Sequence, residues 1–400
     1  MFSRRANNVT PSFTVELNAR IAELNRSGED IIKLNIGEPD FNTPDNIKDA
    51  AKAAIDNNFT RYTPIQGIPD LRKAIIDKLR EDNGVEYTMN EVCVTTGAKQ
   101  ALFEAALTLA DEGDEVIIPT PCWVSYVDMV KIAGGIPVQV PAVGYGKDRY
   151  HLDLEAIAKA VTPRTTAIII NSPNNPASVV YTREELEGLV ALAVENDFWI
   201  ISDEVYEKLL YDGSEHICVA SISPEAKAHT VVVNGCSKSY AMTGWRLGYA
   251  AGPENCMKKI RGLQGHITSG INSITQKAGV EAIMGHQRSV EAMRQEFDRR
   301  RQMMGEKLRA IPHVETTDSL GAFYYLPDVS WYFGKKWQGG VIENSIDMAT
   351  YLLETVKVAV VPGDAFYAPG CLRLSYSNSM ENLEKGLDRL ASALAALKRT

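Results

Sequence analysis

The chain has 400 residues, of which 42 are Lys or Arg and 51 are Asp or Glu, so its formal net charge at pH 7 is −9. Apolar residues make up 45% and charged residues 23%, which is typical of a folded globular protein and argues against extensive disorder. The acidic balance argues against nucleic acid as the main partner, because binding to phosphate backbones needs an excess of Lys and Arg. It does not exclude a local basic pocket for a small anion.

The N-terminal residues MFSRRANNVTPSF do not resemble a targeting signal, because no apolar run of roughly 7–15 residues follows the two arginines. No stretch reaches the roughly 18 apolar residues of a membrane span. The six cysteines form no CxxC pair, the six histidines form no HxH or HExxH pattern, and no G-x-S-x-G occurs. We therefore expect a cytoplasmic protein with reduced cysteines, no metal site, no Ser-His-Asp triad, and neither membrane nor nucleic acid as a partner.

Seven short apolar runs alternate with longer amphipathic stretches between about residue 46 and about residue 285. Arg183–Glu195, for example, has apolar residues at helical spacing. This alternation predicts an α/β fold with a seven-stranded, mostly parallel sheet covered by helices on both faces, and ligands bind beyond the carboxyl ends of the strands in such sheets. The runs are Glu91–Thr95, Glu115–Ile118, Ile136–Val140, Ala167–Asn171, Trp199–Asp203, Thr230–Asn234 and Leu247–Ala251.

The last third of the chain has a different pattern. One long charged helix is expected over residues 288–310, followed by the strand-like segments AFYYL, VAVV and LRLSYS and by a closing helix over Met380–Lys398. A further helix is expected near Thr14–Arg26. We therefore predict a large domain over residues 46–285 and a smaller α+β domain formed by residues 1–45 together with 286–400.

Lys238 follows an apolar strand run, in a segment of small polar residues. A lysine in a surface loop would have no special role, but a buried one is costly unless it is paired or used in chemistry. Arg246 follows in Gly-Trp-Arg-Leu-Gly, where the flanking glycines permit close approach of the backbone. A lysine and an arginine at neighbouring strand ends suit an anionic cofactor that carries an aldehyde.

Asp203 ends another apolar run, and Tyr206 follows it. A carboxylate at a strand end commonly caps the next helix. Alternatively, it can hold a proton on a heteroaromatic nitrogen, as an aspartate does in pyridoxal phosphate (PLP) enzymes that also use a Schiff-base lysine. The sequence contains both partners, Asp203 and Lys238.

Three further segments lie at strand ends. The segment Ser172–Pro176 is either a proline-stiffened turn or a means of placing the Asn175 amide against a phenolic oxygen. The turn at Gly97 exposes backbone amides at a helix N-terminus, which is a general phosphate site, although it lacks P-loop spacing and a G-x-G-x-x-G motif. Trp123 either packs in the core or lies flat on an aromatic cofactor.

With these segments in view, the sequence resembles the class I PLP-dependent aminotransferases of fold type I, and among them the bacterial aspartate aminotransferase subgroup. The resemblance extends over nearly the whole chain. It rests on the segments NIGEPDFNTP, RYTPIQGIPDLR, TGAKQALFEA, SPNNP, SDEVYEKLLY, GCSKSYAMTGWRLG and VVPGDAF, the last followed by RLSYS. The resemblance implies a PLP-dependent transamination between an amino acid, with aspartate as the first choice, and a 2-oxo acid such as 2-oxoglutarate.

The resemblance also implies roles for individual residues. Lys238 would hold PLP as a covalent Schiff base and move the substrate proton, Asp203 would keep the pyridine nitrogen protonated, and Tyr206 with Asn175 would bond the ring phenolate oxygen. Trp123 would stack on the ring. The cofactor phosphate would be bound by Arg246, Ser237 and the amides of Gly97, Ala98 and Lys99.

For the substrate, the resemblance implies that Arg373 clamps the α-carboxylate with its planar fork. Gly37 would lie close to the substrate, together with Trp123 and Asn175. Tyr62 would reach the phosphate of a neighbouring subunit, which implies a homodimer with shared sites. Closure of the two domains on a bound carboxylate would exclude water.

Three departures from the family pattern are visible. Ala177 and Ser178 follow Asn-Pro where the family usually has Thr-Gly, and Gly235 stands where many relatives have Ser. No second arginine is evident for a distal substrate carboxylate, since Arg5, Lys99 and Arg294 are each better explained as surface or phosphate residues.

The amino donor therefore stays open among aspartate, aromatic amino acids, alanine and prephenate-type substrates. A PLP β-lyase on the same scaffold is an alternative, because cofactor and fold do not choose the reaction. A ligand-binding transcriptional regulator is a weaker one, since the roughly 45 residues before the large domain contain no basic helix-turn-helix candidate.

Overall fold

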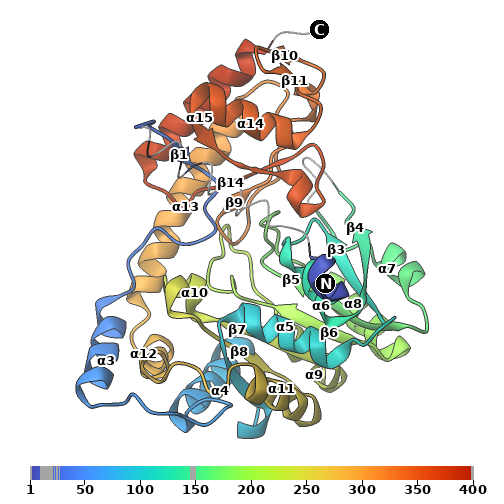
Figure 1. Ribbon diagram of the computed structural model, residues 1–400, viewed down its shortest axis with the longest axis vertical. Coiled ribbons are helices and arrows are strands. Elements are labelled where there is room, and N and C mark those ends of the chain that lie inside the picture. Colours follow the sequence, from blue (N-terminus) through green and yellow to red (C-terminus); the bar gives the residue numbers. More distant parts are fainter. Residues whose placement is uncertain are drawn as a thin grey trace.

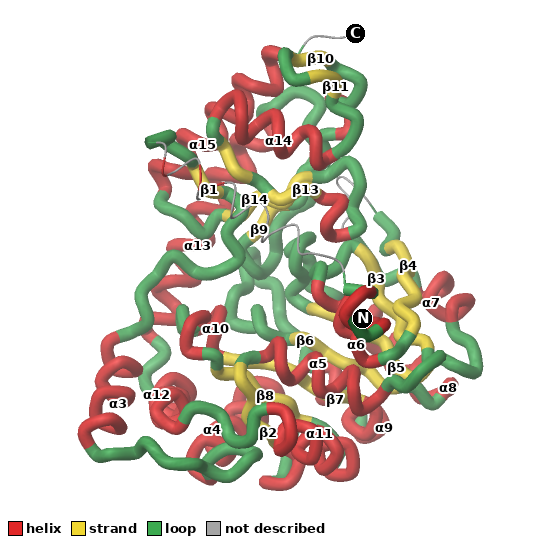
Figure 2. Tube along the Cα trace, viewed as in Figure 1, coloured by secondary structure: helices red, strands yellow, loops and turns green. Residues whose placement is uncertain are grey.

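The computed structural model describes residues 2–9, 21, 23, 26, 28–144 and 150–397. The seven predicted apolar runs form one seven-stranded sheet in the order β2-β8-β7-β6-β5-β3-β4 (Figures 1 and 2). Only β8 runs antiparallel to its neighbours in this sheet; the other pairs are parallel, as expected for strands buried on both faces. The strands are β2 (Val92–Thr96), β3 (Glu115–Thr120), β4 (Ile136–Pro141), β5 (Thr165–Asn171), β6 (Trp199–Asp203), β7 (Thr230–Gly235) and β8 (Leu247–Ala251).

Helices cover both faces of this sheet, which confirms the predicted layers. Because side chains alternate along a strand, Val231 and Val233 of β7 pack beneath one helical layer and Val232 beneath the other. The first layer contains α5 (Ala98–Leu109), α6 (Ser125–Ala133) and α11 (Glu254–Ile267). The second contains α3 (Asp45–Asp56), α4 (Pro69–Asn83), α7 (Leu154–Ala160), α8 (Arg183–Asn196), α9 (Pro224–His229) and α12 (Ser273–Met284).

The C-terminal part of the chain forms a second body above the sheet, with segment 32–34 packed into it (Figure 1). The predicted long helix and closing helix are present as α13 (Arg288–Arg309) and α15 (Met380–Ala396). Between them lie α14 (Ser345–Val356) and a three-stranded antiparallel sheet of β13 (Val361–Pro362), β14 (Leu372–Ser375) and β9 (Tyr324–Tyr325). The second body also contains two short pairs of strands. These are β1 (Ile32–Lys33) with β12 (Val358–Ala359), and β10 (Lys336–Trp337) with β11 (Gly340–Val341).

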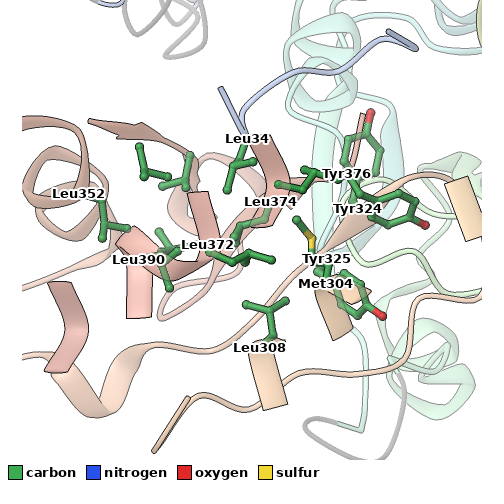
Figure 3. Close-up of a cluster of buried hydrophobic side chains, with 14 of the residues drawn as sticks. Leu34, Met304, Leu308, Tyr324, Tyr325, Leu352, Leu372, Leu374, Tyr376 and Leu390 are labelled. Carbon is green, nitrogen blue, oxygen red and sulfur yellow. The ribbon is translucent and has the colours of Figure 1, made fainter. Parts of the chain in front are cut away.

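The core of this second body is a cluster of leucines and aromatic residues. Leu352 and Leu390 lie at one end of it, and Tyr324 and Tyr376 lie at the other (Figure 3). Tyr206 belongs to the same cluster although it follows β6 of the large sheet. The cluster therefore joins the second body to the carboxyl edge of the sheet.

The helix predicted near Thr14–Arg26 falls largely outside the described residues. All six cysteines are buried and none is in a disulfide, as predicted. Among the helices that the structure describes, none is long and apolar enough to span a bilayer.

Candidate active site

A pocket of about 710 Å³ lies at the carboxyl ends of the parallel strands, between the sheet and the second body. Its lining residues run from Ile21 to Arg373, so residues far apart in sequence meet here. The predicted site residues that line it are Gly37, Ala98, Lys99, Trp123, Asn175, Asp203, Tyr206, Ser237, Lys238, Arg246 and Arg373.

Lys238 lies on the short helix α10 (Cys236–Ser239), directly after β7. Its Nζ donates a hydrogen bond of 2.5 Å to the Gly37 carbonyl oxygen. Burial lowers the pKa of Lys238 to about 8, and the positive charge of Arg373 adds to this effect, whereas Arg246 contributes less. The amine of Lys238 is therefore closer to its neutral, nucleophilic form than that of an exposed lysine.

Asp203 ends β6 and is 4% exposed. Its Oδ2 accepts a hydrogen bond of 2.6 Å from the hydroxyl of Tyr126, on α6. Burial raises the pKa of Asp203 to about 6, and the bond from Tyr126 opposes that rise. A positively charged partner in the pocket would stabilise the ionised carboxylate further.

Arg373 lies on β14 and reaches the pocket from the second body. One guanidinium nitrogen donates to Asn175 Oδ1 at 3.0 Å and another to the Asn35 carbonyl oxygen at 3.1 Å. Its Nε is buried and has no hydrogen-bond partner among the described residues. A buried donor without a partner is costly, so this guanidinium is suited to an anionic ligand.

The N-terminus of α5 is a candidate anion site beside Arg246. Gly97, the N-cap residue, has φ of +77°, and no side chain caps the helix. A Cβ atom at Gly97 would lie 2.5 Å from an Arg246 guanidinium nitrogen, and a Cβ at Gly248 would lie 2.2 Å from the Ala98 backbone nitrogen. The two glycines therefore allow an arginine and free helix amides to converge, which is the chemistry of a phosphate site.

Trp123 and Lys99 form the wall next to this anion site. Lys99 Nζ lies 4.7 Å from the centre of the Trp123 ring and 3.4 Å from Ser125 Oγ. Burial lowers the pKa of Lys99, and repulsion from Arg246 lowers it further. The Trp123 ring is half-buried and packs edge-on against Tyr126, which leaves it available to the pocket.

Two of the departures from the family pattern have a physical explanation. Ser178 adopts a left-handed backbone with φ of +57°, where a glycine is the usual residue, and its Oγ accepts a hydrogen bond from the Tyr324 backbone N–H. Gly235 pairs with Gly248 across β7 and β8, and a Cβ atom there would lie 2.7 Å from the Leu247 carbonyl oxygen. A serine at position 235 would therefore need the pair of strands to shift.

Two predicted residues lie outside the pocket. Gly97 adjoins it through Arg246 but does not line it, and Tyr62 is fully exposed on the segment between α3 and α4. Of the cations considered for a distal carboxylate, Arg294 pairs with Glu291 and bonds the Leu210 carbonyl oxygen instead. Lys99, by contrast, lines the pocket.

Sequence reasoning missed several pocket residues, among them Tyr126, Tyr324 and Glu38. Trp123 precedes α6 and Tyr126 lies in its first turn, where the Tyr126 N–H donates to the Trp123 carbonyl oxygen at 3.1 Å. This spacing of three positions could have indicated that the two side chains lie together. Glu38 accepts a hydrogen bond of 2.6 Å from Thr243, and its charge raises the pKa of Lys238. No local pattern marks Tyr324, because it reads as an ordinary strand residue.

A charged cluster lies behind the Asp203–Tyr206 turn. Glu204, Glu207 and His216 have ligand atoms within 4.8 Å of one another, and His216 Nε2 lies 3.0 Å from Glu204. The Lys78 ammonium already pairs with Glu207 inside this cluster. The expectation of no metal stays a prediction.

The sequence model of the family "Aminotransferase class I and II" matches residues 29–390. The chain belongs to this family. The class I aminotransferases are PLP-dependent transferases, so this aminotransferase is an enzyme that transfers amino groups, as the sequence predicted.

Known aminotransferases are similar to this chain over almost its full length. An aspartate aminotransferase of Bacillus sp. (strain YM-2) is 46% identical over 390 residues, covering 98% of either chain. An aspartate/prephenate aminotransferase of Thermus thermophilus is 44% identical over 395 residues, again 98% of each. The crystal structure of the aspartate aminotransferase from Rhizobium meliloti superposes with a TM-score of 0.95 at 39% identity and covers 100% of both chains. The predicted fold class and family are confirmed.

The pocket fits the cofactor of the family. PLP carries a phosphate, an aldehyde, a phenolic oxygen and a basic ring nitrogen. The pocket presents an uncapped helix N-terminus with Arg246, a lysine with a lowered pKa, and a buried carboxylate. Each group lies on a different element around a single cavity.

Proposed function

We propose that this aminotransferase transfers the amino group of aspartate to 2-oxoglutarate, with PLP held covalently by Lys238. The observation that carries the proposal is the buried Nε of Arg373, which finds no partner in the described part of the chain and lies in the cavity that also contains Lys238 and Asp203. Relatives named aspartate aminotransferase, at 42–46% identity, support aspartate as the donor.

In this proposal Arg246, Ser237 and the N-terminal amides of α5 would hold the cofactor phosphate. Asp203 would stabilise a proton on the ring nitrogen, Tyr206 and Asn175 would donate to the phenolic oxygen, and Trp123 would pack on the ring. When bound, PLP supplies an aldehyde that condenses with amino groups and a ring that accepts the electron pair released at the substrate Cα.

Lys238 handles the protons of the reaction at its Nζ. Because burial and Arg373 lower its pKa to about 8, a substantial fraction of the amine is neutral at physiological pH. Glu38 opposes this effect, since its carboxylate favours the charged form. Asp203 stays ionised when it faces a protonated ring nitrogen, because opposite charges attract strongly in a dry site.

Arg373 binds the α-carboxylate and orients the substrate through two parallel N–H donors. It reaches the pocket from the second body, whereas Lys238 belongs to the large sheet. We propose that these two bodies are the domains over residues 46–285 and over 1–45 with 286–400. A substrate bound between them would close the site and exclude water.

Recognition of a distal carboxylate needs one more cation. The pocket is lined by two lysines besides Lys238, namely Lys33 and Lys99, of which Lys99 adjoins Trp123 and Arg246. Lys99 is therefore our candidate for this role, in addition to or instead of a role at the phosphate. A homodimer in which Tyr62 reaches the partner's phosphate and a cytoplasmic location stay predictions.

The deciding experiment compares the purified protein, loaded with PLP, with its Lys238→Ala variant. Wild type should show a visible cofactor band and form glutamate from aspartate and 2-oxoglutarate, and Lys238→Ala should lose both. Lys277→Ala, which removes a half-buried lysine that pairs with Asp70 and does not line the pocket, is the matched control. Turnover by Lys238→Ala at the wild-type rate would overturn the assignment.

A donor and acceptor panel then fixes the substrates. Prephenate is the second acceptor to test, because a relative at 44% identity is named an aspartate/prephenate aminotransferase. Formation of pyruvate with ammonia or sulfide, without glutamate, would instead indicate the β-lyase alternative.

A further inference from the structure

Tyr324 lies where the second body meets the catalytic edge of the sheet. It is fully buried, lines the pocket, and lies at the end of the core cluster opposite Leu352 (Figure 3). Its hydroxyl is 3.0 Å from that of Tyr206, and the two rings meet edge to face with centres 6.0 Å apart. The centre of its ring also lies 4.4 Å from the guanidinium carbon of Arg373. One side chain thus contacts both a proposed cofactor residue and the proposed carboxylate clamp.

The backbone of Tyr324 is held from two sides. On β9 it pairs with Ser375 of β14, close to Arg373 on the same strand. Its N–H donates a hydrogen bond of 3.2 Å to the hydroxyl of Ser178, in the turn that follows Asn175. Tyr324 is therefore fixed relative to both walls of the pocket, and its hydroxyl has little freedom to leave Tyr206.

Counting the hydroxyl protons gives the direction of the bond. Two tyrosines have two protons, and either hydroxyl can donate when they are alone. When Tyr206 donates its proton to the phenolic oxygen of the cofactor, the Tyr206 oxygen can only accept from its neighbour. Tyr324 must then be the donor, and hydrogen bonds in such a chain strengthen one another.

The ring of Tyr324 has a separate task. Arg373 contacts two aromatic rings, because its guanidinium carbon lies 4.4 Å from the centre of the Tyr324 ring and 4.8 Å from the centre of the Phe366 ring. A desolvated guanidinium held against aromatic faces keeps its orientation while its N–H donors remain free for a carboxylate.

We propose that Tyr324 is a positioning residue that acts on both the cofactor side and the substrate side of the site. Its hydroxyl donates to Tyr206 and thereby directs the Tyr206 proton toward the cofactor, while its ring orients Arg373 for the α-carboxylate. This inference rests on the proposed function, and it goes beyond the residues that the family resemblance supplied.

The hydroxyl is tested with Tyr324→Phe in the PLP-loaded protein. The measurement is the pH midpoint of the cofactor's visible absorbance. A hydrogen-bond donor to the phenolic oxygen reduces the negative charge beside the Schiff-base nitrogen. Loss of the Tyr324 hydroxyl makes Tyr206 a weaker donor and should therefore raise the pH midpoint. The expected rise is about 0.5 pH unit if the strength of the Tyr206 hydrogen bond changes by about a tenth to a third. Tyr376→Phe is the matched control, because Tyr376 is equally buried in the same cluster, bonds Ser319 through its hydroxyl, and does not line the pocket.

The role of the Tyr324 ring is tested with succinate, a dicarboxylate without an amino group. Its dissociation constant is measured from the change that it causes in the cofactor's visible absorbance. Tyr324→Phe keeps the ring and should bind succinate as wild type does, whereas Tyr324→Leu should bind it about tenfold more weakly. In a Tyr206→Phe background, Tyr324→Phe should have no further effect on the midpoint. The hydroxyl test uses only Tyr→Phe variants, so it does not depend on whether Tyr324→Leu folds.

The outcomes separate the two proposals. An unchanged midpoint in Tyr324→Phe, or an equal shift in Tyr376→Phe, would overturn the hydroxyl role, and undiminished succinate binding by folded Tyr324→Leu would overturn the ring role. Absence of a Lys238-dependent absorbance band in wild type would instead overturn the proposed function itself.

Discussion

The buried ion pair between Lys78 and Glu207 offers a quantitative test of how the turn behind the active site is held. The two side chains are 7% and 6% exposed, and Asn83 donates a further hydrogen bond of 2.9 Å to Glu207. Burial alone would raise the pKa of Glu207, but Lys78, His216 and Asn83 together lower it to about 2. The interval from 4.5 to about 2 corresponds to roughly 3 kcal/mol of stabilisation of the charged form.

Replacing Lys78 by Met removes the partner and leaves a buried carboxylate uncompensated. We expect the free energy of unfolding to fall by about 3–5 kcal/mol at neutral pH, as for other broken buried pairs. Lys78→Met/Glu207→Leu should recover much of this loss, because no unpaired charge remains. Urea unfolding followed by circular dichroism, at one fixed protein concentration, measures all three proteins.

The pH dependence gives a second check. In wild type the depressed pKa of Glu207 contributes stability that is present above about pH 4.5 and is lost as the pH falls toward 2. In Lys78→Met the folded-state pKa of Glu207 is raised instead, so that variant recovers stability on acidification. The difference in unfolding free energy between wild type and Lys78→Met should therefore be largest at neutral pH and should decrease toward pH 5. A difference under about 1 kcal/mol at neutral pH, or one that increases on acidification, would refute the reasoning.

Two further predictions concern contacts that the sequence did not reveal. Tyr126→Phe removes the hydrogen bond that opposes the raised pKa of Asp203. PLP affinity should decrease on acidification in both proteins, and in Tyr126→Phe this decrease should begin about one pH unit higher than in wild type. Fluorescence titration measures the affinity, and an unshifted pH profile would contradict this. Ser178→Ala should lower the free energy of unfolding by about 1 kcal/mol through loss of the bond to Tyr324, whereas Ser178→Gly should be nearly neutral because it also relieves the left-handed backbone. Equal losses in both Ser178 variants, measured by urea unfolding, would contradict the strain argument.

The fold could be predicted where the sequence has a strong local pattern. All seven apolar runs are strands of the large sheet, because β-branched runs buried on both faces have few alternatives. The long helix over 288–310 was placed within one residue of α13, since its apolar positions repeat at helical spacing. The strands of the second body are only two to four residues long. A sequence pattern of that length can indicate that a strand is present, but it does not define where the strand begins and ends.

The candidate site could be predicted only through the residues that carry motifs. Lys238, Asp203 and Arg373 line one pocket as expected. The contacts of Tyr126 with Asp203 and of Tyr324 with Tyr206 join segments 77 and 118 residues apart, and no local spacing encodes such pairs. The same limit applies to the lowered pKa of Lys238, because its main cause is burial, followed by the charge of Arg373 from a distant segment.

The six buried cysteines have a practical consequence for experiments on this enzyme. Burial raises the pKa of Cys93, Cys122, Cys236, Cys256 and Cys371 to about 12, and that of Cys218 well above its usual value. At pH 8 only about one thiol in ten thousand would then be a thiolate, the form that reacts with alkylating reagents. A single cysteine introduced at the exposed Tyr62 should thus be labelled selectively in the otherwise native sequence, and a fluorophore there would report directly on whether a second copy of the chain approaches.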